Sequence, residues 1–124
     1  MAVINGTSSA DTLSDTSGND TFIFRENGTA NADVIGDWTS GSDEVALDNA
    51  AMGALGADGA FVAGDARFWS SSAGVAHDAS DRVIYNQSTG SLYYDADGNG
   101  IGAAQLIATL TGTPTVAATD IVVI

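Results

Sequence analysis

The sequence has no cysteine and no lysine, and it has only 3 basic residues against 16 acidic ones. Without cysteine, the chain can form no disulfide, no zinc-thiolate site and no thiol nucleophile. The formal net charge of −13 repels other polyanions, which argues against nucleic acid and anionic membranes as partners. Self-repulsion on this scale also disfavours a compact state unless cations neutralise it.

Long apolar runs are also missing. No segment approaches the roughly 20 apolar residues that span a bilayer, so we expect no membrane insertion. The beginning, MAVINGTSSA, has neither the basic region nor the apolar run of a cleaved signal peptide, so no such export route is visible. The length of 124 residues predicts one domain with a small core.

The acidic residues are almost all of one kind. Apart from Glu26 and Glu44 they are aspartates, and they stand among glycine, asparagine, serine and threonine. This composition is typical of turns, and turns rich in carboxylate oxygens favour hard cations.

The first part of the chain contains an internal repeat. The stretch NGTSSADTLSD at residues 5–15 returns as NGTANADVIGD at residues 27–37. The stretch TSGNDTF at residues 16–22 returns as TSGSDEV at residues 39–45, and Trp38 is one extra residue before it. Each half of the repeat ends in an aspartate with an apolar residue two positions later, in the pairs Asp11 and Leu13, Asp20 and Phe22, Asp33 and Ile35, and Asp43 and Val45.

A fixed period of about 20 residues is typical of stacked units. We therefore predict a coil in which each short strand points its apolar side chain inward and each turn offers an aspartate outward. Stacking would place Asp11 on the same side as Asp33 and Asp20 on the same side as Asp43. Calcium, which accepts about 6–8 oxygen ligands, would relieve the repulsion between such carboxylates. The alternative is an ordinary series of hairpins with solvated aspartates in the turns.

These units resemble degenerate copies of the G-G-x-G-x-D-apolar-x repeat of RTX (hemolysin-type) calcium-binding proteins. The first glycine of the repeat stands at Gly6 and Gly28, and the mid-turn glycine stands at Gly18 and Gly41. The double glycine is kept nowhere. The segment DVIGDWTSGSDEVALD, residues 33–48, is similar to the segment that closes RTX rolls.

Two later segments extend the resemblance. Residues 81–112 resemble the segment that follows the roll in many RTX proteins, and the final ATDIVVI resembles their carboxyl terminus. The likeness covers nearly the whole chain except residues 49–80.

The resemblance implies an all-β domain of residues 1–124 that begins with a short, degenerate parallel β-roll of two coils at residues 2–48. It implies calcium as the cofactor, and the candidate ligands in this part are Asp11, Asp20, Asp33, Asp37 and Asp43. It also implies bacterial type I secretion, in which an ABC transporter reads the uncleaved carboxyl end and the chain folds on calcium outside the cell. On this interpretation the chain carries no enzymatic activity.

Residues 49–80 form a connection rich in alanine, glycine and serine. Residues 50–55 can make one or two helical turns, with Asn49 as the cap. Phe61, Phe68 and Trp69 are predicted to cover a small core, and the alternative is an exposed aromatic binding patch.

The last third, residues 81–124, predicts antiparallel strands. Residues 83–85 and 92–94 are predicted to form a hairpin around the turn NQSTG. Residues 103–110 and 121–124 are predicted to be third and fourth strands. We expect these strands to form a small antiparallel sheet or sandwich that caps the open end of the coil, with little helix anywhere.

The stretch DADGNG is a second candidate calcium site. Asp95, Asp97 and Asn99 match the first half of an EF-hand loop, but Leu106 stands where the closing glutamate belongs. We therefore predict a partial calcium loop between two strands. The alternative is a polar turn whose side chains bond their own backbone.

No catalytic motif is present. The only histidine, His77, could be grouped with Ser72 and Asp81, but a solvent-exposed loop histidine is the preferred interpretation. Two function classes remain. The first is the calcium-folding, secreted RTX carboxyl-terminal domain. The second is a complete small structural protein of a surface layer, matrix or filament, which would self-associate through the open coil end at residues 2–13.

Overall fold

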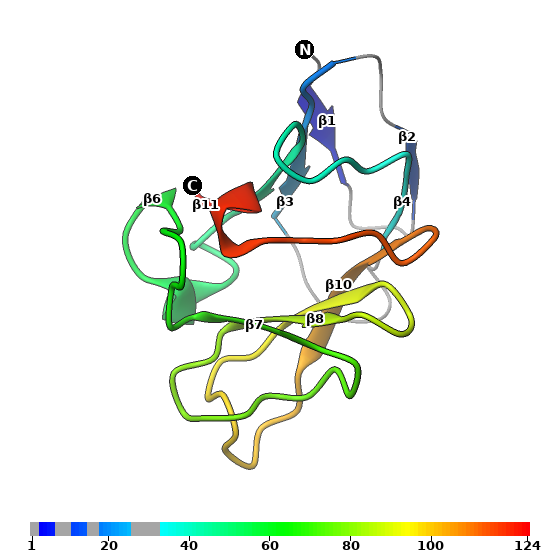
Figure 1. Ribbon diagram of the computed structural model, residues 1–124. Coiled ribbons are helices and arrows are strands. Elements are labelled where there is room, and N and C mark those ends of the chain that lie inside the picture. The colour runs from blue at the N-terminus through cyan, green and yellow to red at the C-terminus, as the bar shows by residue number, and fades with distance from the viewer. Residues whose placement is uncertain (1–2, 7–10, 15–17, 26–32) are drawn as a thin grey trace.

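The computed structural model describes residues 3–6, 11–14, 18–25 and 33–124, and in this part of the chain the regular secondary structure consists mainly of short strands joined by turns and loops (Figure 1). The strands are β1 (Val3–Asn5), β2 (Thr12–Ser14), β3 (Thr21–Phe24), β4 (Asp33–Gly36), β5 (Glu44–Leu47), β6 (Gly59–Ala60), β7 (Phe68–Ser71), β8 (Val83–Asn86), β9 (Ser91–Tyr94), β10 (Gln105–Leu110) and β11 (Ile121–Val123). Two 3₁₀ helices, η2 (Gly53–Leu55) and η3 (Ala118–Asp120), are the described helical elements. The expectation of an all-β chain with little helix is confirmed.

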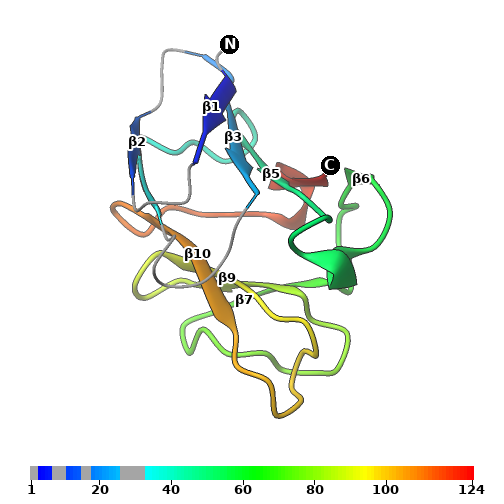
Figure 2. The same ribbon diagram turned by 180° about the vertical axis from the view of Figure 1, so that it is seen from behind.

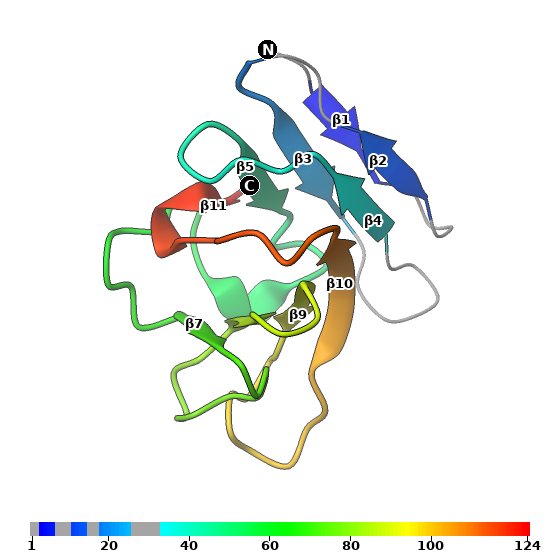
Figure 3. The ribbon, with the colours of Figure 1, turned by 45° about the vertical axis from the view of Figure 1, so that its right-hand side comes forward.

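The strands form two mixed sheets. One has the order β1-β3-β5-β11-β6, and the other has the order β2-β4-β10-β9-β8-β7. The first five strands alternate between the sheets, so that β1, β3 and β5 pair in parallel in one sheet and β2 and β4 pair in parallel in the other. Figure 3 shows these strands stacked on one another.

The internal repeat is a repeat in space. Leu13 is in register with Ile35, and Phe22 is in register with Val45. All four side chains are buried, with at most 7% of the surface exposed. The predicted stacking of the two copies and the inward direction of their apolar residues are therefore both confirmed. Successive side chains of a strand point to opposite faces, so a short strand can bury its apolar residue while the neighbouring residues face away from the core.

The end of the chain departs from the expectation. Strand β10 pairs antiparallel with β9, as predicted, but it also pairs in parallel with β4. Strand β11 joins the other sheet, where it lies parallel to β5 and antiparallel to β6. The predicted antiparallel pairing is thus confirmed for β8, β9 and β10, but the prediction that residues 121–124 add a fourth strand to the same sheet is wrong. Instead, β10 and β11 continue the two sheets of the repeat, as Figures 1 and 2 show.

The predicted hairpin is confirmed. Strands β8 and β9 pair antiparallel, with Tyr85 opposite Leu92. Gly90 ends the turn between them at a φ of 78°, and its Cβ position would meet the carbonyl oxygen of Leu110 in β10. A side chain here would push the hairpin away from β10, so glycine is required by both the conformation and the close approach.

The connection differs in detail from its prediction. Only Gly53–Leu55 is helical, and no side chain caps it. The amide of Asn49 instead donates to the Gly56 carbonyl and to the Asp58 carboxylate, so Asn49 is not the predicted cap. Within the described residues, no helix is long and apolar enough to cross a membrane.

The core lies between the two sheets and under the connection. Phe61 is buried and Phe68 packs against the core, as predicted. Trp69 is only half-buried and stacks on His77. Trp38, the extra residue of the second copy, is buried, lies 6.1 Å from the Phe22 ring centre, and donates its indole N–H to the Thr115 carbonyl. It therefore joins the repeat to the segment that leads into β11.

Candidate metal centres

The aspartates of the stacked turns lie in pairs along the coil. The Asp33 carboxylate accepts the backbone N–H of Asp11 at 2.7 Å, and the Asp43 carboxylate accepts the backbone N–H of Asp20 at 3.0 Å. Asp43 also accepts the N–H of Thr39 at 2.7 Å. The structure thus brings Asp11 to Asp33 and Asp20 to Asp43, as the repeat predicted, with each carboxylate of the second copy bonding the backbone of the first.

Asp120 extends this arrangement, and sequence reasoning missed it. It is buried at the entrance to β11, and its carboxylate accepts the N–H of Gly41 at 2.9 Å and the hydroxyl of Ser40. It also accepts the N–H of Ala117 at 2.8 Å. Asp120 therefore bonds the turn before β5, much as Asp43 bonds the turn before β3. The signal was its position directly before the apolar run at residues 121–124.

Gly6 shows why the first glycine of the repeat is needed. A Cβ at this position would collide with the Asp33 carboxylate of the next copy and would crowd the Phe24 ring. Because the carboxylate occupies that space, a larger residue would displace it. The position of the aspartate in the second copy therefore requires the glycine in the first copy.

Asp37 is not brought into this arrangement. It is exposed and takes a left-handed conformation, with a φ of 56°. None of the described hydrogen bonds joins it to the other predicted ligands. Its assignment as a ligand therefore stays a prediction.

The three arginines neutralise little of the buried charge. Arg25 contacts Asp48, and Arg67 pairs with Asp65 at 2.8 Å. Arg82 donates to the carbonyl oxygens of Ala79 and Asp81 rather than to a carboxylate. The pairing with Arg67 lowers the pKa of Asp65 to about 2. Among the described ion pairs, none links an arginine to Asp43, Asp95 or Asp120, which are all buried.

The loop that follows β9 holds the second predicted site. Asp95 is buried, and its carboxylate accepts the N–H of Asp97 at 3.2 Å. The Asp97 Oδ2 accepts the N–H of Gly102 at 2.7 Å, whereas its Oδ1 is buried and has no hydrogen-bond partner. Burial and the neighbouring Asp97 carboxylate raise the pKa of Asp95, and the Gly102 N–H lowers the pKa of Asp97. Two close carboxylates, one of them with an unsatisfied oxygen, are a donor set that fits a hard cation.

This loop is not shaped like an EF-hand. Gly98, at a φ of 63°, takes the left-handed conformation, whereas Gly100, at the position of the invariant EF-hand glycine, does not. Asn99 is exposed, and its backbone N–H donates to the Asp78 carbonyl at 3.0 Å. The loop therefore packs on the loop that carries His77, and part of its polar bonding is internal, as the alternative interpretation supposed.

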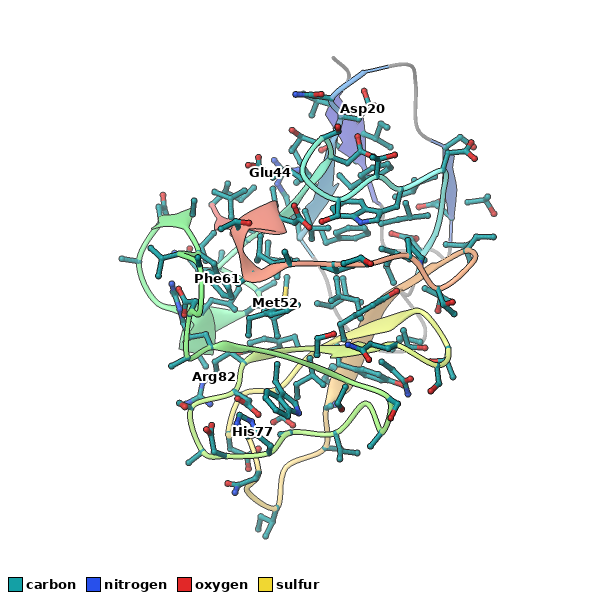
Figure 4. The ribbon with its side chains drawn as sticks, in the orientation of Figure 1. Asp20, Glu44, Met52, Phe61, His77 and Arg82 are labelled. Atoms are coloured by element: carbon teal, nitrogen blue, oxygen red, sulfur yellow. The ribbon has the colours of Figure 1, made fainter. Side chains whose placement is uncertain are left out.

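A third cluster lies in that neighbouring loop. His77, Asp78 and Asp81 each offer a ligand atom, and these atoms lie within 4.8 Å of one another, so the cluster can hold a metal ion. The His77 Nδ1 lies 2.7 Å from the Asp81 Oδ2, and the His77 Nε2 lies 3.3 Å from the Asp78 Oδ2. Figure 4 shows His77 at the opposite end of the molecule from Asp20.

Sequence reasoning underestimated His77. The side chain is 44% exposed, in agreement with a loop histidine, but it is bonded to Asp81 and stacked on Trp69. No described hydrogen bond joins it to Ser72. The signal that could have found the cluster is the spacing H-D-x-x-D, which places two carboxylates within one turn of the only histidine.

Comparison with known proteins found no family model and no curated protein that matches the chain.

Proposed function

We propose that the chain is a secreted, calcium-binding RTX-type carboxyl-terminal domain that folds on calcium outside the cell and carries an uncleaved type I secretion signal. The observation that carries the proposal is the register of the repeat. Its two copies stack residue by residue, with paired aspartates at the turns, and their strands alternate between two sheets, as the strands of a parallel β-roll would. The strands β10 and β11 would supply a third coil.

The charge distribution supports a cation requirement. The formal net charge is −13, and Asp43, Asp95 and Asp120 are buried without a described arginine partner. Backbone N–H groups stabilise some of this charge, but burial of carboxylates remains costly. Calcium that binds only the folded state would stabilise it by RT ln(1 + [L]/Kd) per site, which is about 1–3 kcal/mol at several to 100 times Kd.

The first prediction tests this proposal. Circular dichroism of the full chain in chelator should show little β-signal, and millimolar calcium should produce a cooperative gain, because extracellular-type sites bind at about 10⁻⁴–10⁻³ M. Calorimetric titration with calcium is the parallel measurement of binding. A chain that is fully folded in chelator, with a melting temperature that calcium leaves unchanged, would refute the calcium role.

A structural subunit is the second candidate, and one observation favours it. Strand β1 lies at the edge of its sheet, and Val3 is 57% exposed there. An open edge of this kind can pair with another chain. Size-exclusion chromatography with and without calcium separates the two candidates, since a monomer in both conditions supports the secreted domain and a calcium-dependent assembly supports the subunit.

A further inference from the structure

We propose that His77 and Asp78 bind a divalent transition metal ion such as Zn²⁺, and that Asp81 positions the imidazole for it. This site lies outside the stacked turns of the repeat, next to the loop that carries Asp95 and Asp97, and it does not depend on the proposed function. Both ring nitrogens of His77 contact a carboxylate. Its Nδ1 contacts the Asp81 Oδ2 at 2.7 Å, which is a hydrogen-bond distance, and its Nε2 faces the Asp78 Oδ2 at 3.3 Å.

The second distance matches two ligands of one ion. Zinc binds imidazole nitrogen at about 2.0–2.1 Å and carboxylate oxygen at about 2.0–2.2 Å, so two such atoms at a tetrahedral angle lie about 3.3–3.5 Å apart. The first distance matches the outer carboxylate that metal-bound histidines usually have, which accepts the other ring N–H and sets the tautomer. The ring nitrogen makes the site unlike a calcium site, since calcium is bound by oxygen.

Both proposed ligands are held in place by their surroundings. The His77 ring stacks on Trp69, with the ring centres 3.6 Å apart and the planes inclined by 12°. The Asp78 Oδ1 accepts the N–H and the hydroxyl of Ser80, at 2.9 and 2.7 Å, which leaves Oδ2 toward the imidazole. A hollow of about 430 Å³, lined by His77, Asp78, Trp69 and Gly64 among others, adjoins the pair and gives room for further ligands such as water.

The environment of the Asp81 carboxylate also indicates a nearby cation. Its side chain is fully buried, and its Oδ2 accepts the backbone N–H of His77 at 2.7 Å as well as facing the ring. Its Oδ1 is buried with no hydrogen-bond partner. A buried carboxylate with an unsatisfied oxygen is costly, and a cation bound across the imidazole would stabilise its charge.

The test is a calorimetric titration of the full chain with Zn²⁺, in calcium and in calcium-free buffer. Because His77 is the only histidine, His77→Gln removes the imidazole ligand alone. We expect His77→Gln and Asp78→Asn each to weaken Zn²⁺ binding at least tenfold, whereas the exposed control Asp58→Asn should bind as the parent does. Absence of binding by the parent chain, or undiminished binding by His77→Gln, would overturn the proposal.

Nuclear magnetic resonance of the single imidazole tests the role of each nitrogen. With ¹⁵N-labelled histidine, Zn²⁺ should shift the Nε2 signal while Nδ1 keeps its proton. Asp81→Asn, which retains an acceptor for that proton, should weaken binding about 10–100-fold through loss of charge, without moving the metal to Nδ1. A zinc-induced shift at Nδ1 instead of Nε2 would overturn the assignment, and this readout does not depend on whether the Asp81 variant folds.

Discussion

At the scale of the residue, the aspartates of this protein have the same side chain but distinct roles. Asp43 and Asp120 are buried acceptors for backbone N–H groups of an adjacent turn. Asp95 and Asp97 crowd each other in one loop, and Asp81 faces an imidazole. Of these groups, burial and the neighbouring Asp97 carboxylate raise the pKa of Asp95, so its charged form is disfavoured.

The second prediction concerns Asp43. Replacement by alanine would leave the buried N–H group of Asp20 and the N–H group of Thr39 without this acceptor, and bonds to a charged group contribute about 1.5–3 kcal/mol each. We expect Asp43→Ala to lower the free energy of unfolding by about 2–4 kcal/mol in urea titrations with calcium present. The exposed control Asp58→Ala should change it by less than about 0.5 kcal/mol. Equal stability of the two variants would show that the carboxylate does not hold the turns together.

The third prediction concerns Asp95, whose pKa is raised by burial and by the charge of Asp97. The folded state then disfavours the ionised form, so this residue costs stability at neutral pH, and the cost disappears as the pH falls through the folded pKa toward the ordinary value of 3.8. In calcium-free buffer, with sulfate added to favour the folded state, Asp95→Asn should therefore raise the melting temperature at pH 7 and leave it unchanged near pH 3.

Calcium should reverse the sign of this effect. If Asp95 and Asp97 bind the ion, Asp95→Asn should weaken calcium binding and reduce the stabilisation that calcium provides, whereas the charge-matched control Asp58→Asn should do neither. A variant that binds calcium as the parent does would show that the loop is only the polar turn of the alternative interpretation.

At the scale of the element, β11 places the last apolar run in a sheet. Ile121 and Val123 are buried and Val122 alternates outward to partial exposure. The strand is paired on both sides, in parallel with β5 and antiparallel with β6. The three residues of β11 therefore lie inside a sheet, and Ile124 follows the strand and donates its N–H to the Leu47 carbonyl at 2.9 Å.

The fourth prediction is that deletion of residues 120–124 has two effects. Loss of two buried side chains, at about 1.5–3 kcal/mol each, and of the Asp120 bonds to the turn at residues 40–41 should markedly lower the melting temperature with calcium. If the proposed export signal is at this end, the same deletion should abolish secretion through a type I transporter. Ile121→Ala, which keeps the length, separates the effects: it should lower stability and leave secretion largely intact. Normal secretion of the deletion would contradict the export role, and an unchanged melting temperature would contradict the structural one.

At the scale of the whole molecule, charge and topology act together. The net charge of −13 repels the compact state, and the chain must close two sheets whose strands come from distant parts of the sequence. For example, β4 pairs with β10 although residues 37–104 separate the two strands in the sequence. Such long-range pairing carries a large loop-closure cost before it contributes stability.

The fifth prediction separates specific calcium binding from charge screening. At equal ionic strength, sodium chloride screens the repulsion between exposed carboxylates only, whereas calcium would also be bound by the paired and buried ones. Millimolar calcium should thus raise the melting temperature well above the value in matched sodium or magnesium chloride. Equal melting temperatures in the three salts would mean that ionic strength alone stabilises the folded state.

The sequence by itself determined the strand class, the stacking of the two repeat copies, their inward residues and the hairpin of β8 and β9. These features depend on local periodicity and on turn chemistry, which short segments carry within themselves. Only the tertiary structure decided that β10 and β11 continue the two sheets, that Asp120 bonds the turn before β5, and that Asp78 and Asp81 flank the stacked ring of His77. The physical reason is that an apolar strand can pair with any open edge, and a carboxylate can bond any nearby N–H, so that the partner is chosen by the packing of segments far apart in the chain.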